Sequence, residues 1–175
     1  TEQALAYFDN YFSRRFGGAN HQGAKPATVG DLVTALNVKR ATLAQEWMQV
    51  EVSTFSKHLA DIYQLHFYEP YEVLPQVINY IRSKVGSDVP IDAWETGFSW
   101  SSTQGYTPDA LANELPTLYT TMFNSGVRYA VYLEAVDLPP TTNEADRPRG
   151  LISLSGQYYP GAAAFMTLAQ TIDRH

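Results

Sequence analysis

Hydrophobic positions recur along the chain at two spacings, one typical of helices and one typical of buried strands. Between Glu2 and Phe16 the apolar residues fall three or four positions apart, which predicts a helix that Gly17 and Gly18 end. The same spacing predicts further helices at residues 42–58, 73–85, 107–125 and 161–172.

Short apolar runs between turn residues predict strands at residues 61–68, 89–94 and 127–133. Residues 25–31 suggest one more strand, although Leu32 to Leu36 also fit a helix. Strands that alternate with helices of this length indicate βα units around a parallel sheet. Four strands do not close a barrel, so the expected fold is a small open α/β sheet or half of an eight-stranded barrel. Residues 1–175 show no repeat and no long linker, so we expect a single unit.

Composition supports a folded domain and disfavours two classes of partner. Hydrophobic residues make up 45% of the 175 positions, which is enough to bury a core. The formal net charge of -6, with 12 scattered Lys and Arg residues, disfavours nucleic acid, because binding to phosphates depends on clustered cations. No apolar run reaches membrane-spanning length, and no signal peptide precedes the first helix. We therefore expect neither nucleic acid nor membrane as a partner, and both a secreted and a cytoplasmic location stay open.

The sequence also lacks the usual signatures of metal, nucleotide and thiol chemistry. It contains no cysteine, no glycine-rich phosphate loop after a strand, no metal-ligand cluster and no Ser/His/Asp motif. We expect no cofactor and no metal. The 12 tyrosines suit a surface that stacks on a flat or sugar-like ligand, although core packing also explains many aromatic residues.

Polar and aromatic residues gather where the predicted strands end, which is where parallel βα folds carry their functional groups. In chain order, the three strand ends supply His66, Phe67, Tyr68 and Glu69, then Glu95, Thr96, Gly97 and Trp100, then Glu134 and Asp137. Each of them alone is explained as well by helix capping or core packing. Their order along the chain carries more information than any one of them.

That order resembles the clan A (β/α)8-barrel retaining glycoside hydrolases. The run from Asp61 to Tyr68, followed by the run from Val89 to Trp100, resembles strands six and seven of that clan. Residues 107–137 look like helix seven and strand eight, and residues 150–160 are similar to the segment before the last helix. The resemblance covers residues 55–175 and implies an α/β fold, the C-terminal half of a (β/α)8 TIM barrel with parallel strands.

The resemblance implies a role for particular residues. In this clan a Glu at the end of strand seven is the nucleophile, and Glu95 matches that position. Tyr68 would orient its carboxylate, since a hydroxyl donor favours the charged form, and His66 would line the same cavity. Trp100 and Trp94 would present aromatic faces to a sugar ring. The implied substrate is a β-linked glycoside or polysaccharide.

A second carboxyl group is missing from this pattern. Retaining hydrolysis needs two carboxyl groups about 5 Å apart, and in clan A the second belongs to an Asn-Glu pair after strand four. The Asn-Glu pairs here are Asn113-Glu114, in a predicted helix, and Asn143-Glu144, in a predicted loop, and neither fits. We therefore expect the acid upstream of Thr1 or in another chain, a partner N-terminal half-barrel without which this part is inactive.

Two other functions stay open. The missing acid also suits a non-catalytic half-barrel module that binds carbohydrate or a protein partner. A small open α/β domain with unrelated chemistry is the third interpretation, and no motif supports it.

Overall fold

The computed structural model describes residues 27–36, 39–97, 107–137 and 150–172, and of residues 35–36 and 39–42 the backbone alone. Contacts divide the chain into two compact units, and one of the boundaries between them falls within a helix, between Ile78 and Asn79. The first holds the described residues up to Asp61 together with Asn79–Val89, and the second holds Ile62–Ile78 with the described residues from Pro90 onward. The predicted helix at residues 2–16 lies outside the described residues.

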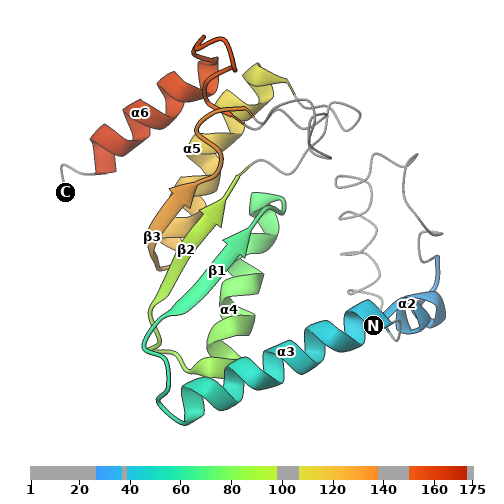
Figure 1. The fold of residues 1–175 in the computed structure, drawn as a ribbon. Helices are drawn as coiled ribbons and strands as arrows, with labels where there is room; N and C mark the ends of the chain where they lie inside the picture. The colour runs from blue at the N-terminus through green and yellow to red at the C-terminus, as the bar shows by residue number, and fades with distance from the viewer. Residues whose placement is uncertain (1–26, 37–38, 98–106, 138–149, 173–175) are drawn as a thin grey trace. The chain divides into compact units, whose positions relative to one another are not determined.

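Helices and strands alternate from β1 onward (Figure 1). In chain order the elements are α2 (Val29–Leu36), α3 (Lys39–Ser56), β1 (Tyr63–Phe67), η1 (Tyr71–Val73), α4 (Leu74–Val85), β2 (Ile91–Thr96), α5 (Pro108–Asn124), β3 (Val127–Tyr132) and α6 (Pro160–Ile172). Except for residues 25–31, the strands and helices predicted within the described part are all present, with ends that differ by up to three residues.

The prediction of a strand at residues 25–31 is wrong, because α2 begins at Val29. A reciprocal cap explains the helix: Oγ1 of Thr28 accepts from the Asp31 N–H at 3.1 Å, and Oδ2 of Asp31 accepts from the Thr28 N–H at 2.9 Å. Hydrogen bonds to the Asp31 carboxylate from the side chain and the backbone N–H of Thr28 lower the pKa of Asp31. The described part therefore has three strands in place of the expected four.

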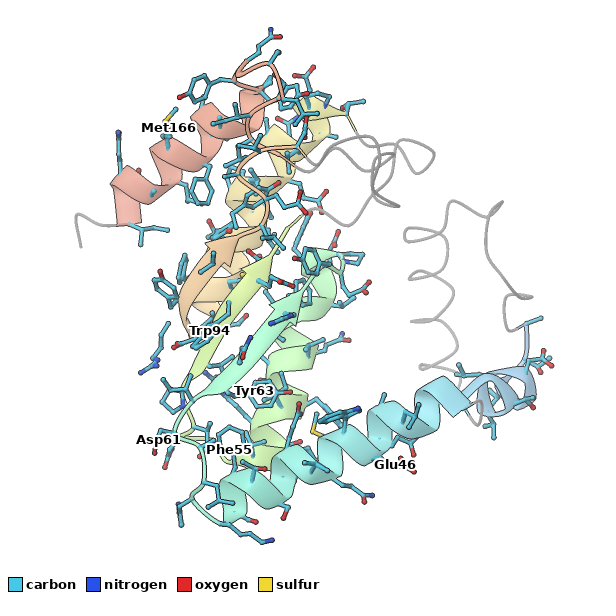
Figure 2. The ribbon with its side chains drawn as sticks, viewed as in Figure 1. Glu46, Phe55, Asp61, Tyr63, Trp94 and Met166 are labelled. Carbon is cyan, nitrogen blue, oxygen red and sulfur yellow. The ribbon has the colours of Figure 1, made fainter. Side chains whose placement is uncertain are left out.

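The three strands form one parallel sheet in the order β1-β2-β3, so the fold is α/β with parallel strands, as expected. One face of β1 and β2 is buried, with Tyr63, Leu65 and Phe67 beside Ile91 and Ala93. Gln64 and His66 alternate with these residues and are exposed on the other face. Figure 2 shows Tyr63 on β1 and Trp94 on β2.

The helix α5 begins and ends as its sequence predicts. Oγ1 of Thr107 accepts from the Ala110 N–H at 3.0 Å, and Pro108 occupies the first turn, where no N–H is needed. The helix continues through Pro116 and ends at Asn124, before Gly126 at a φ of 82°. Three aromatic rings of the second unit pack together. The ring centroids of Tyr119 and Tyr132 lie 5.6 Å and 5.8 Å from the ring centroid of Phe165 on α6.

A buried hydroxyl joins β2 to α5. Thr96 is fully buried, and its Oγ1 lies 2.8 Å from the Tyr119 hydroxyl and donates to the Val131 carbonyl at 2.8 Å. Burial raises the pKa of Tyr119 to about 12, and the hydrogen bond with Thr96 offsets part of that rise. These hydrogen bonds hold the end of β2 against α5, and both buried hydroxyl groups have a hydrogen-bond partner.

Stability should fall as pH rises through the range between 10 and 12. Unfolded chains lose the tyrosine proton near pH 10, whereas Tyr119 keeps its proton in the folded state until about pH 12. By pH 11 this difference amounts to on the order of 1 kcal/mol. In Tyr119→Phe this contribution to the pH-dependent loss should disappear, at a cost of about 1 kcal/mol at neutral pH for the lost hydrogen bond.

Urea unfolding at pH 8 and pH 11 measures both effects. Tyr158→Phe makes the same substitution at a side chain that is 67% exposed, and serves as the control. Identical pH dependence in wild type and Tyr119→Phe would show that the hydroxyl is not held in its neutral form.

Candidate functional site

An extra residue in β2 determines where Glu95 lies. Leu65 pairs with Ala93 and Phe67 with Thr96, so β1 advances by two residues while β2 advances by three. β3 likewise advances by two, from Ala130 to Tyr132, over the same stretch. Such a bulge re-aims the side chains next to it. Without the extra residue, the position two after Ala93 would share the buried face of Ala93.

The bulge brings Glu95 into register with His66. Nδ1 of His66 lies 3.0 Å from Oε2 of Glu95, within hydrogen-bond distance. The side chains are 49% and 36% exposed, so a ligand can reach both. Two of the predicted site residues therefore meet at the carboxyl end of the sheet. Glu95 lies inside β2, which extends two residues beyond its predicted end.

Gln64 belongs to the same site, and the sequence analysis did not identify it. Its amide nitrogen lies 2.6 Å from Nε2 of His66. The signal in the sequence was the spacing of two, because residues i and i+2 of a strand share a face. Gln64, His66 and Glu95 thus form one continuous row of contacts across β1 and β2.

An ion pair neutralises the other carboxylate of β2. Nε and one terminal nitrogen of Arg128 donate to the two carboxylate oxygens of Asp92 at 3.1 Å and 3.0 Å. Asp92 is 7% exposed, and a two-point contact of this kind compensates a buried charge well. Neither residue was predicted. Asp92 is in register with Tyr129 and serves to hold β2 to β3.

Tyr68 and Gly97 lie against each other just beyond the paired strands. A Cβ placed on Gly97 would lie 2.5 Å from the carbonyl oxygen of Leu133 and 3.0 Å from Cε1 of Tyr68. The Leu133 N–H also donates to the Thr96 carbonyl at 2.7 Å, so backbone and ring pack closely at this point. Tyr68 is therefore placed beside the end of the strand that carries Glu95, and its predicted role of orienting that carboxylate stays a prediction.

Of the two predicted tryptophans, the structure describes Trp94 alone. Trp94 adjoins Glu95 within the bulge and is 52% exposed, although tryptophan side chains are usually mostly buried. Trp100 lies outside the described residues, as does the Asn143-Glu144 pair. Asn113-Glu114 lies in α5, as predicted.

Asp137, one of the predicted strand-end carboxylates, has a structural role. Oδ1 accepts from the Gly150 N–H at 3.0 Å, and Oδ2 accepts from the Tyr159 hydroxyl at 2.8 Å. This hydrogen bond from Tyr159 to the carboxylate raises the pKa of Tyr159. Asp137 thereby ties the end of the β3 segment to the segment that leads into α6.

The described residues contain no group of three or more His, Asp or Glu side chains that would hold a metal ion. In the same part of the chain, no helix is both long and apolar enough to cross a membrane. A hollow of about 200 Å³ opens beside β3, at the edge that pairs with no other described strand. We call it the β3-edge groove, and it is lined by Tyr119, Phe123, Arg128, Tyr129, Ala130, Phe165, Leu168, Ala169 and Ile172.

Gly97→Ala should destabilise the protein by about 1–3 kcal/mol, because the added methyl group overlaps a backbone oxygen that cannot rotate away. Denaturant unfolding measures the change. Gly30→Ala in α2 is the matched control, since its Cβ would meet only Oγ1 of Thr28 at 3.6 Å, an ordinary contact. A Gly97→Ala variant as stable as the control would contradict the close packing at the end of β2.

Comparison with known proteins finds no matching family model and no matching curated protein. Among solved structures, the chain is similar to the exo-β-1,4-mannosidase Op5Man5 from Opitutaceae bacterium strain TAV5, with a TM-score of 0.45 and 17% sequence identity. The match covers 61% of this chain and 19% of the mannosidase chain. A similarity of this extent does not assign an activity.

Proposed function

We propose that this chain is the part of a retaining glycoside hydrolase that carries the nucleophile, Glu95. The observation that supports it most is the contact of 3.0 Å between Oε2 of Glu95 and Nδ1 of His66 at the carboxyl end of a parallel sheet. That end of a βα sheet is where catalytic groups gather. Both side chains are accessible, as a group that attacks a substrate must be.

The chemistry assigns a separate task to each side chain. A retaining enzyme uses one carboxylate to attack the anomeric carbon, which forms a covalent glycosyl-enzyme intermediate that water then hydrolyses. Glu95 performs that attack. His66 holds the carboxylate in one orientation, so that an oxygen faces the sugar when it binds. Tyr68, packed against Gly97, supports the same carboxylate from the end of β1.

Trp94 supplies an apolar surface beside the nucleophile. Its side chain is 52% exposed and directly precedes Glu95 in the chain. Aromatic faces favour the apolar faces of sugar rings, so Trp94 together with Trp100 would bind the sugar next to the bond that is cleaved. The proposed substrate is a β-linked glycoside or polysaccharide.

The second carboxyl group is assigned to an N-terminal half-barrel, either an upstream segment or a separate chain. Two features support such a partner. Among the described strands, β1 and β3 each pair with β2 alone, so each has an edge on which another strand can pair. The β3-edge groove also exposes apolar side chains beside one of these edges, as a surface that packs against further structure would.

Glu95→Gln should lower turnover of an aryl β-glycoside by about 1,000-fold or more in the assembled protein, because an amide cannot act as the nucleophile. The shape of the side chain is kept, so unfolding by denaturant should change little. Glu46→Gln changes an exposed carboxylate of α3 in the same way and should keep full activity. Unchanged turnover in Glu95→Gln would exclude Glu95 as the nucleophile.

Chemical rescue tests the assigned role more narrowly. Azide added to Glu95→Ala should restore cleavage of an activated β-glycoside and yield the glycosyl azide of inverted configuration, because the small anion attacks from the vacated position. An azide product of retained configuration would make Glu95 the acid/base. If calorimetry shows that the assembled wild type binds oligosaccharide but no turnover is detected, the protein is instead a non-catalytic carbohydrate-binding module.

A further inference from the structure

The contact between Gln64 and His66 restricts the protonation of the imidazole ring. The amide nitrogen of Gln64 lies 2.6 Å from Nε2 of His66, and the opposite ring nitrogen, Nδ1, lies 3.0 Å from Oε2 of Glu95. Both ring nitrogens are therefore occupied, one by an amide and one by a carboxylate. These contacts lie on the exposed face of β1, to which the spacing of two in the strand brings both side chains.

With the amide nitrogen of Gln64 facing Nε2, as in the structure, donor and acceptor rules allow one arrangement of protons for these contacts. A side-chain amide nitrogen only donates, so Nε2 of His66 must accept and carry no proton. A neutral imidazole has one protonated nitrogen, which is then Nδ1. Nδ1 donates its proton to the carboxylate of Glu95, which only accepts when ionised.

We propose that Gln64 is a positioning residue that holds His66 as the neutral tautomer protonated on Nδ1, so that the ring donates to Glu95. The catalytic consequence of this inference rests on the proposed function, whereas the tautomer itself does not. The contact of Gln64 is with Nε2 of His66, on the side of the ring away from Glu95. Gln64 acts through His66, in the way that the hydrogen bond to one ring nitrogen sets the state of the other.

Loss of the amide removes this restriction. Without Gln64 no donor faces Nε2, so the ring can take a second proton there while Nδ1 still donates to the carboxylate of Glu95. A carboxylate in place of the amide acts in the opposite direction, because it accepts from Nε2 and favours a ring protonated on both nitrogens. Gln64→Leu therefore removes the hydrogen-bond donor that faces Nε2, whereas Gln64→Glu replaces it with an acceptor.

Nitrogen NMR on the full-length protein labelled with ¹⁵N-histidine reads the tautomer directly. The chain has four histidines, and His66→Gln identifies the signals of the ring in question. At neutral pH the wild type should show a protonated Nδ1 and an unprotonated Nε2. In Gln64→Leu the Nε2 signal should move toward the protonated value, and in Gln64→Glu both nitrogens should be protonated.

Gln76 provides matched controls, because it is exposed on α4 and carries the same amide. Gln76→Leu and Gln76→Glu should leave the His66 signals unchanged. A wild-type ring protonated on Nε2, or a Gln64→Leu variant whose His66 signals match the wild type, would overturn the role of Gln64. Purely structural damage would shift signals of the other histidines as well, and would equally count against a positioning role.

Kinetics links the tautomer to the proposed reaction. In Gln64→Glu the carboxylate of Glu95 faces a charged ring and attacks less readily, so kcat should fall roughly tenfold with little change in KM.

The two proposals fail separately. If the tautomer responds as expected but the assembled wild type cleaves no glycoside, the glycosidase proposal fails alone; if Glu95→Gln abolishes turnover and the tautomer does not respond, the inference on Gln64 fails alone.

Discussion

The extra residue in β2 is the constraint on which the rest of the site depends. A strand that alternates strictly would place the side chain two positions after Ala93 on the buried face, against the helix layer. The bulge shifts the alternation by one, so that Thr96 reaches the helix layer and Glu95 reaches the opposite face beside His66. A single inserted position thus gives a buried hydroxyl on one face and an accessible carboxylate on the other.

Much of the fold follows from apolar spacing and capping residues. Thr107, Pro108 and Gly126 predicted the limits of α5, and short apolar runs predicted β1, β2 and β3. The strand expected at residues 25–31 was wrong, because the reciprocal cap between Thr28 and Asp31 starts a helix there, although the β-branched Thr28 and Val29 favour a strand. Local hydrogen bonds of this kind outweigh a weak preference for extended backbone.

The site was less predictable than the fold. Glu95, His66 and Tyr68 were selected because they follow strands in a known order, and that order does not depend on register. Gln64 and the pair of Asp92 with Arg128 were missed, because their partners are set by the alignment of neighbouring strands. A bulge leaves no mark in composition or periodicity over six residues, so only the three-dimensional register shows which side chains meet.

The contacts of Asp137 have a consequence for how the chain can vary. Gly150 donates to its carboxylate, and a Cβ at Gly150 would lie 2.4 Å from the Asp137 backbone nitrogen, so the two ends of residues 138–149 are fixed side by side. When the ends of a loop are already held together, each doubling of its length costs only about 0.6 kcal/mol. Insertions between Asp137 and Gly150 should therefore lower the free energy of unfolding only slightly. Asp137 comes after the carboxyl end of β3, and in a parallel sheet that is the end that carries Glu95, so residues inserted after Asp137 could add new ligand specificities without rebuilding the strands.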